Sequence, residues 1–525
     1  MPTMICDGIR LSLIKTVVLQ KNFQVAAVIA FVAIALRIWI CKSGFFYDDG
    51  MIVLRVAENI ARGDGFCYNI GEHLQAATSL LWTLIAAAVW KLFPSSSFLA
   101  IRLLGSLLDS FAAVGIALML MFGRSSGEGR VNPPGSDPIV SALAAGLFYA
   151  CASTSALAGP SGLETGLYTL LIAASFFALI NSYIRAAIIL SVLLVMVRPD
   201  GVLVATTFAF FVLTRNRRHL AFVSITYLTC GLAYVLGAHS YFHSILPQTV
   251  LAKQLFARSA ENEWGLVIHH FFLGPAAPTG LLALLGIVEI VRRHPELRAF
   301  LLWSALYVTC FATFSQWWPW YLPPVVLVYS VCVGVGLELA LRIALETLDL
   351  TRYLIPIGVA LSLMLALAMT ALTIQKVHPM SQAQTLRLER GQRVASVLTR
   401  ASSKNDTIML EPLGIIGFYT PRTFYDYPGL ASPKTTEVLK TLHTRISKVP
   451  DDPRVMKLLL ANVKPDWLVL RQAEYDADKA GNALCTCRLF ATVAPRAFNG
   501  ETSDPGKQCG DCNATMYLLR CSALN

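Results

Sequence analysis

Long apolar runs recur along most of this chain, and they constrain its fold more than any other feature of the sequence. Within the 525 residues, the runs are about 17 to 25 residues long, which is the length that a helix needs to cross a bilayer. Only 14% of the residues are charged, and the mean hydropathy is +0.58. These properties predict a polytopic membrane protein whose membrane domain is all-α.

The runs and the breakers between them predict about twelve helical segments. The expected segments are residues 23–41, 77–93, 98–122, 139–159, 163–181, 184–198, 200–214, 219–238, 266–290, 298–314, 321–341 and 353–375. The connections at 215–218 and 292–298 are rich in Arg, which is typical of cytoplasmic loops. The formal net charge of +11 has the same origin, because Lys and Arg lie in such connections, and no nucleic-acid partner is expected.

The charge pattern also predicts the topology. Basic residues before the first span, and the lack of a cleavage pattern after it, indicate an uncleaved signal anchor with the N-terminus inside. Counting crossings from the basic connections places the region after residue 375 outside, which requires an odd number of crossings. Two interpretations satisfy this requirement: 77–93 is a re-entrant or interfacial helix, or 184–214 is one long helix broken at Pro199. The expected total is about 11 to 12 transmembrane segments.

The composition changes beyond residue 375, where charged residues, Asn and Pro become frequent and no further long apolar run occurs. Residues 376–525 have the size of one compact domain. An amphipathic helix is expected from Gln382 to Arg400, and buried strands are expected at 407–410 and 467–470. The chain is therefore expected to consist of a membrane domain, residues 1–375, and a small soluble α/β domain, residues 376–525.

The first outer loop, residues 42–77, is unusually polar and contains two adjacent carboxylates, Asp48 and Asp49. The apolar run that ends at Cys41 places this pair about where a helix leaves the bilayer. Ionisable groups at that depth are costly and are functional by default. The alternative interpretation is a solvated turn without a chemical role.

Several motifs follow one another in an order and spacing typical of one family. They are Tyr47-Asp48-Asp49-Gly50, Arg55-Val56-Ala57-Glu58-Asn59, Gly63-Asp64-Gly65-Phe66, Thr78-Ser79-Leu80-Leu81-Trp82, Ser161-Gly162-Leu163-Glu164-Thr165, Arg198-Pro199-Asp200-Gly201, Leu246-Pro247-Gln248-Thr249, Trp320-Tyr321-Leu322-Pro323 and Asp426-Tyr427-Pro428-Gly429-Leu430. With this set the chain resembles the polytopic C-type glycosyltransferases, and it is most similar to the subgroup around the mycobacterial terminal arabinofuranosyltransferases. It departs from them at two positions, because Gln75 stands where relatives usually carry Glu and Gln248 stands where they carry Asn.

The resemblance implies a glycosyltransferase in the cytoplasmic membrane with its active site and C-terminal domain on the outer side. Such enzymes take a sugar, here arabinofuranose or another pentose or hexose, from a polyprenyl-phosphate donor and pass it to a glycan, lipid or protein acceptor. This transfer requires a carboxylate base near the acceptor hydroxyl and cations near the departing phosphate. We expect Asp48 to be the base and Asp49 to orient the acceptor or to hold an optional Mg²⁺ or Mn²⁺ ion. No cofactor beyond this optional ion is expected.

The expected substrate-binding residues are polar or aromatic and lie at predicted outer membrane edges or within apolar surroundings. They are Arg55, Gln75, Thr78, Glu164, Arg198, Gln248, Lys253, Trp320 and Tyr321. Lys253 is a candidate for the lipid phosphate, and its alternative role is an anchor among lipid headgroups. Arg55 lies two helical turns after Asp48, so a structural ion pair is its alternative role. Trp320 and Tyr321 are either interfacial anchors or a stacking wall for the substrate.

Five cysteines lie near the C-terminal end: Cys485, Cys487, Cys509, Cys512 and Cys521. Two close pairs of thiolates are also typical of a structural zinc site. In the oxidising compartment that the topology predicts, disulfides are the favoured interpretation.

Two other functional classes fit parts of the sequence. A transporter or flippase for a polyprenyl-linked substrate accounts for charged residues within the membrane, but it predicts internal repeats, and the two halves show no self-similarity. A non-catalytic envelope-assembly protein leaves the adjacent carboxylates unexplained. There is also no phosphate-cradling Gly-rich loop for a nucleotide-sugar donor.

Overall fold

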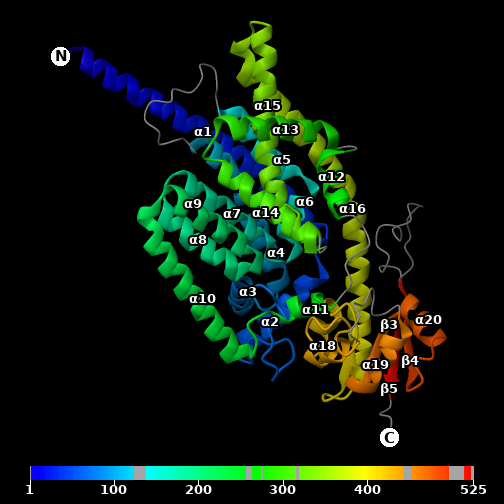
Figure 1. The fold of residues 1–525 in the computed structure, drawn as a ribbon. Helices are drawn as coiled ribbons and strands as arrows, with labels where there is room; N and C mark the ends of the chain where they lie inside the picture. The colour runs from blue at the N-terminus through cyan, green and yellow to red at the C-terminus, as the bar shows by residue number, and fades with distance from the viewer. Residues whose placement is uncertain are drawn as a thin grey trace.

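The computed structural model describes residues 2–122, 138–255, 263–273, 276–314, 318–442, 452–495 and 514–521. Over these ranges the chain is mostly helical, with a small sheet near the C-terminal end (Figure 1). The membrane domain contains α1 (Pro2–Lys42), α2 (Asp48–Arg62), α3 (Leu80–Leu92), α4 (Ser97–Phe122), α5 (Pro138–Cys151), α6 (Ser153–Ala156), η1 (Gly159–Ser161), α7 (Thr165–Ile180), α8 (Ile184–Val197), η2 (Pro199–Gly201), α9 (Val202–Arg215), η3 (Arg217–His219), α10 (Leu220–Phe242), α11 (Gln248–Lys253), α12 (Glu263–Phe272), α13 (Ala277–Arg293), α14 (Arg298–Phe314), η5 (Pro319–Tyr321), α15 (Pro323–Thr347), η6 (Thr351–Tyr353) and the first part of α16 (Leu354–Ala401).

The C-terminal part contains helices and strands that alternate along the chain. They are β1 (Thr407–Met409), α17 (Gly414–Tyr419), β2 (Thr423–Tyr425), α18 (Pro433–Lys440), α19 (Pro453–Val463), β3 (Trp467–Arg471), α20 (Gln472–Ala480), β4 (Cys487–Val493) and β5 (Met516–Cys521). The strands form one sheet in the order β2-β1-β3-β5-β4. β1 is parallel to β2 and β3, whereas β5 is antiparallel to β3 and β4. The expected small α/β unit and its two predicted strands are therefore confirmed.

Within the described residues, five helices are long and apolar enough to cross a membrane. They are Gln20–Lys42, Ser97–Phe122, Arg217–Phe242, Pro323–Thr347 and Thr351–Ala401. Residues 138–161 form a further pair of apolar helices that is bent by 59°. Shorter apolar helices occupy four more of the expected segments: Leu80–Leu92, Thr165–Ile180, Ile184–Val197 and Arg298–Thr313. These apolar helices make the chain a multi-pass membrane protein.

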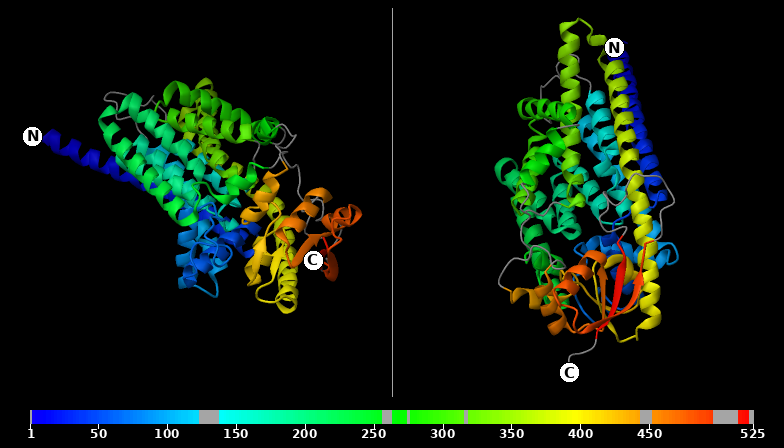
Figure 2. Two further views of the ribbon diagram at one scale, coloured as in Figure 1. Left: turned by 60° about the horizontal axis from the view of Figure 1, so that its bottom comes forward. Right: turned by 90° about the vertical axis from the view of Figure 1, so that its right-hand side faces the viewer.

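The two segments on which the crossing parity depends are both short or broken helices. Residues 184–214 form α8 and α9, which are separated at the expected break by the turn η2, in which Gly201 lies against the backbone of Leu194 and Val195. The segment 77–93 is the short helix α3, of only 13 residues. The expected segment 266–290 also differs, since α12 and α13 divide it. The N-terminus and the C-terminal sheet lie at opposite ends of the molecule (Figures 1 and 2).

One helix joins the membrane domain to the C-terminal part. α16 runs for 48 residues without a break, so the amphipathic segment from Gln382 to Arg400 is the end of the last apolar helix. The expected domain boundary at 375 therefore lies inside a helix. In Figure 2, α16 extends along the length of the molecule and ends beside the sheet. A continuous helix fixes the sheet relative to the membrane helices. We call residues 376–521 the outer domain, after the side of the membrane that the sequence predicts for it.

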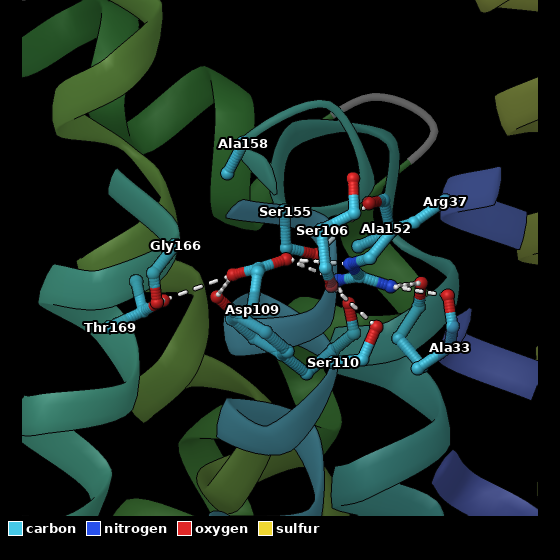
Figure 3. Close-up of polar contacts among 12 residues, drawn as sticks. Ala33, Arg37, Ser106, Asp109, Ser110, Ala152, Ser155, Ala158, Gly166 and Thr169 are labelled. Atoms are coloured by element: carbon cyan, nitrogen blue, oxygen red, sulfur yellow. Dashed lines mark hydrogen bonds and ion pairs between the residues drawn. The ribbon is translucent and has the colours of Figure 1, made fainter. Parts of the chain in front are cut away.

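The membrane helices are held together by a buried polar network. Arg37 of α1 and Asp109 of α4 are completely buried, with 2.6 Å between Nη2 and Oδ2. The other carboxylate oxygen accepts hydrogen bonds from Tyr149 at 2.7 Å and Thr169 at 3.0 Å (Figure 3). Removing one partner of such a pair would leave a buried charge uncompensated, at a cost of about 3–5 kcal/mol. The network therefore fixes α1, α4, α5 and α7 beneath the first outer loop.

Candidate active site

The first outer loop is built on α2, which begins at Asp48 and ends at Arg62, just before Gly63. Gly63 has φ of 94°, a left-handed conformation that suits glycine and stops the helix. Asp48 is buried, and each of its carboxylate oxygens accepts a backbone amide hydrogen bond from the start of α17. The donors are Gly414 at 2.8 Å and Ile415 at 3.0 Å. Asp48 thus attaches the loop to the outer domain.

Two further polar residues of the loop make the same kind of attachment. Arg55 donates to the backbone oxygens of Tyr68 at 2.9 Å and Arg422 at 2.7 Å, and also to that of Gly417. Asn69 exchanges two 2.9 Å hydrogen bonds with the backbone of Phe424. Within the part of the chain that the structure describes, Arg55 does not form the ion pair that was its alternative role. Its N–H groups donate to backbone carbonyls of both the first loop and the outer domain, so Arg55 joins the two.

The expected substrate residues Gln248, Gln75 and Thr78 also lie in this contact region. The Gln248 side chain donates to the Gly429 backbone oxygen at 2.9 Å and to the Thr436 hydroxyl at 3.0 Å. The backbone amide of Gln248 donates to the backbone oxygen of Gln75. The Thr78 hydroxyl is 2.7 Å from the Thr249 hydroxyl. These contacts hold α11, and with it Lys253, against the loop and the outer domain.

Asp49 differs from its neighbour, since it is half-buried and none of the hydrogen bonds described above involves it. Burial, with the negative charge of Asp48 as a second cause, raises the pKa of Asp49 to about 6. The positive charges of Lys253 and Arg387 oppose this rise, and Glu164 adds to it. Burial also raises the pKa of Asp48, and the Ile415 and Gly414 amides oppose that rise. The pKa of Asp49 therefore lies about one unit below neutral pH.

Lys253 and Arg198 are linked through Tyr321. The Lys253 ammonium donates to the Tyr321 hydroxyl at 3.3 Å, and the Arg198 guanidinium lies 4.6 Å from the centre of the Tyr321 ring. Arg198 also donates to Asp200 at 3.0 Å and to the Trp320 backbone oxygen at 3.1 Å. Its contact with Glu164 is longer, at 4.0 Å. Arg198 is almost fully buried, so it positions the turn η5 and does not present its charge to solvent.

The aromatic residues of η5 face the first loop. Trp320 lies edge-on to Tyr47, with 5.6 Å between the ring centres, and stacks on Trp318 at 5.4 Å. Tyr47 immediately precedes the two carboxylates, so this wall lies beside Asp49. Trp317 lies outside the described residues.

Two cations of this site were not found by the sequence reasoning. Arg387 of α16 and Arg471 of β3 both act on the Asp48 carboxyl, and Arg387 also acts on Asp49. They are far from the first loop in the chain and belong to no motif. The one signal in the sequence that points to these two cations is their position on a helix and a strand that follow an apolar segment.

Neither a metal site nor a zinc site is formed by the described part of the chain. No group of three or more His, Cys, Asp or Glu side chains is arranged there to hold a metal ion. Cys487 forms a disulfide with Cys521, which joins β4 to β5 and removes Cys487 from the zinc alternative. Cys485 is exposed and is not disulfide-bonded, and Cys509 and Cys512 lie outside the described residues.

Comparisons with known proteins agree with this arrangement. Residues 377–505, most of the outer domain, match the family described as "Domain of unknown function (DUF8728)". The terminal beta-(1->2)-arabinofuranosyltransferase of Mycobacterium tuberculosis is 27% identical over 275 residues, which cover 47% of this chain. The match spans 42% of the length of that relative.

Two solved structures share the fold over most of the chain. ArnT from Cupriavidus metallidurans, bound to undecaprenyl phosphate, has a TM-score of 0.59 at 13% identity, covering 94% of this chain and 97% of that one. The oligosaccharyltransferase AglB from Archaeoglobus fulgidus, in complex with an inhibitory peptide and a dolichol-phosphate, has a TM-score of 0.55 at 12% identity, covering 85% and 69%. Both are C-type glycosyltransferases that use polyprenyl-phosphate-linked sugars. The resemblance to C-type glycosyltransferases that the sequence predicts is confirmed, and the chain has the fold of this class.

Proposed function

We propose that this protein is a membrane glycosyltransferase that moves a sugar from a polyprenyl-phosphate donor to an acceptor hydroxyl outside the cytoplasmic membrane. The observation that carries the proposal is the half-buried Asp49, with a pKa of about 6, acted on by the charge of Lys253 beside the membrane helices. The fold shared with a protein bound to undecaprenyl phosphate supports the class of donor. The local similarity to an arabinofuranosyltransferase supports arabinofuranose as the sugar, with another pentose or a hexose as the alternative.

Asp49, rather than Asp48, is the general base in this proposal. A base must reach the acceptor hydroxyl and must be largely ionised at neutral pH while still able to accept a proton. The pKa of about 6 supports the second condition, and the half-buried Asp49 carboxylate, which takes part in none of the hydrogen bonds described above, supports the first. The two oxygens of Asp48 are occupied by amide donors from α17, so Asp48 positions the loop. This reverses the roles expected from the sequence.

The donor phosphate is held by Lys253, with Arg387 as a second cation. When the sugar leaves the donor, the phosphate gains negative charge, and fixed cations stabilise that charge without reorganisation. Trp320 and Tyr321 form the wall against which the sugar or the first prenyl unit packs, and Glu164 contributes a second carboxylate to the same region. Arg55, Gln75, Thr78, Gln248 and Arg198 hold this constellation in place.

The experiment uses the purified full chain in nanodiscs with radiolabelled polyprenyl-phosphoryl-arabinofuranose and an alkyl arabinofuranoside acceptor. Donors that carry another pentose or a hexose are tested in parallel. The measured product is free polyprenyl phosphate together with elongated acceptor. Asp49→Asn should abolish it. Asp64→Asn, an exposed carboxylate just beyond α2, is the matched control and should be active. Failure of the wild-type protein to consume any of the donors would refute the proposal.

A further inference from the structure

The carboxyl ends of the three parallel strands of the outer domain meet at one edge of the sheet. β1, β2 and β3 run in the same direction, so the residues that follow Met409, Tyr425 and Leu470 lie together. In open α/β sheets this edge is where ligands bind. The chain that leaves β1 reaches Gly414, the residue that donates to Asp48, only three residues after Glu411. Three residues span at most about 11 Å, so this edge lies next to the catalytic loop.

A continuous set of polar and aromatic side chains occupies this edge. The Arg471 guanidinium lies 3.7 Å from the Glu411 carboxylate, and its Nε donates to Glu474 at 2.6 Å. Next along the chain, Gln472 accepts a 2.6 Å hydrogen bond from the Tyr517 hydroxyl. The rings of Tyr517 and Tyr475 stack with 4.1 Å between their centres. We call Glu411, Arg471, Gln472, Glu474, Tyr475 and Tyr517 the edge cluster.

The cluster is partly open to solvent and, apart from Arg471, whose charge acts on Asp48, it is not used by the proposed chemistry. The Glu411 side chain is 34% exposed, and Gln472, Tyr475 and Tyr517 are half-buried. Most side chains of the loop-to-domain contact are buried and are bonded to backbone atoms. The edge cluster instead combines carboxylate, guanidinium, amide and phenol groups with a pair of aromatic rings at an accessible position.

We propose that the edge cluster is the binding site for the acceptor, and that the acceptor is a neutral glycan whose terminal hydroxyl reaches Asp49. The inference rests on the proposed function. Carboxylate, amide and phenol groups hydrogen-bond to sugar hydroxyls, and Tyr475 and Tyr517 supply an apolar surface for a sugar ring. At the cluster, the carboxylates of Glu411 and Glu474, with that of Asp476 bonded to Gln472, face two cations, Arg471 and Lys479, the latter 5.5 Å from the Tyr475 ring centre, so the net charge is negative by one. This balance disfavours anionic acceptors such as phosphorylated lipids.

The test separates acceptor binding from donor chemistry. The full chain in nanodiscs is probed with a panel of neutral oligosaccharides built from arabinofuranose, galactofuranose or mannose, and with a phosphorylated oligosaccharide. Binding is read by saturation-transfer NMR without donor, and release of polyprenyl phosphate from the labelled donor is measured separately without acceptor. The variants are Glu411→Gln, which keeps the size of the side chain, and Tyr517→Ala. Lys464→Ala, an exposed cation at the opposite end of β3, is the control.

We expect at least one neutral oligosaccharide to bind, and the phosphorylated one not to bind. Glu411→Gln and Tyr517→Ala should weaken that binding about ten-fold and raise the acceptor KM by a similar factor, with slow donor hydrolysis unchanged. Lys464→Ala should behave as the wild type. Equal binding by the wild type and Glu411→Gln, binding of the phosphorylated saccharide alone, or no saccharide binding at all would overturn the acceptor site. If the wild-type protein releases no polyprenyl phosphate from the donor, that result would instead count against the proposed function.

Discussion

The carboxylate of Asp48 accepts a 2.8 Å hydrogen bond from the backbone amide of Gly414, a residue 366 positions further along the chain. No side chain fits at Gly414, because a Cβ atom there would collide with Asp48 itself. The contact joins the first residue of α2 to the first residue of α17. The first outer loop and the outer domain therefore form one unit, and the geometry of Asp49 depends on both.

Replacing Asp49 by Asn should remove the general base and leave the fold intact. A positioned base contributes roughly 10²–10⁴-fold to the rate, so kcat should fall by about that factor while donor binding is retained. The measurement is transfer under single-turnover conditions, with thermal unfolding in detergent as the control for folding. Transfer at more than a tenth of the wild-type rate in a correctly folded Asp49→Asn protein would exclude the role.

Replacing Asp48 by Asn should have a different signature. The amide has one oxygen in place of two, so one of the Gly414 and Ile415 amides would be left unsatisfied, at a cost of about 1–3 kcal/mol. We expect a lower unfolding temperature and easier proteolysis between the loop and the outer domain, with part of the activity retained. If Asp48→Asn unfolds like the wild type but has lost all transfer, Asp48 is the base and the sequence-based assignment stands.

The pKa of Asp49 predicts the acid limb of the pH profile. The base must be ionised, so kcat/KM should rise with pH through a midpoint near 6 and fall about ten-fold per unit well below it. The Lys253 charge lowers this pKa and the Asp48 charge raises it. Hence Lys253→Met should move the midpoint upward and Asp48→Asn should move it downward. A midpoint near 4 that neither variant shifts would contradict the assignment.

The same shift has a consequence for stability. The pKa of Asp49 in the folded protein lies above its ordinary value of 3.8, so the folded state binds more protons between these values. This contribution to stability is complete below about 3.8 and is lost as the pH rises through about 6. Asp49→Asn should therefore flatten the dependence of the unfolding temperature on pH in this window.

The sequence predicted those features that arise from local pattern. Apolar length located most membrane helices, and strand-like runs located β1 and β3. The adjacent carboxylates, which the sequence predicts as the centre of the site, lie at the contact between the first loop and α17. The partners of Arg55 could not be predicted, because backbone carbonyls at Gly417 and Arg422 leave no mark in the sequence. Arg55 was expected to bind substrate, and its contacts across the two parts of the chain are an addition that only the fold shows.

Pairings over long distances were also beyond prediction. Arg37 lies in an apolar run and Asp109 lies in another, 72 residues away. Each alone indicates a costly intramembrane charge, but only the packing of α1 on α4 shows that they compensate each other. The cations Arg387 and Arg471 were missed for the same reason, since the fold brings them to the carboxylates from outside any motif.

The side of the membrane on which the outer domain lies is predicted from charge. A cysteine at exposed Ser403 should react with an impermeant maleimide on intact cells, and a cysteine at Asn216 should react only after permeabilisation. The exposed native residues Cys230 and Cys485 are first replaced by Ser. Labelling of both reporters from the same side would mean an even number of crossings between them and would overturn the topology.

Lys253 provides the sharpest test of how the donor is held. Its ammonium is kept in place by the Tyr321 hydroxyl at 3.3 Å, and its charge acts on Asp49, so a donor phosphate bound there would lie beside the base. A hydrogen bond to a charged group contributes roughly 1.5–3 kcal/mol, which corresponds to a ten- to hundred-fold effect. Lys253→Ala should therefore raise the donor KM by about that factor, and Lys253→Arg should recover part of the loss. Tyr321→Phe, which removes only the hydroxyl that positions the ammonium, should have a smaller effect in the same direction. Unchanged donor KM and kcat in a normally inserted Lys253→Ala protein would mean that the residue contacts lipid headgroups and that the phosphate is held elsewhere.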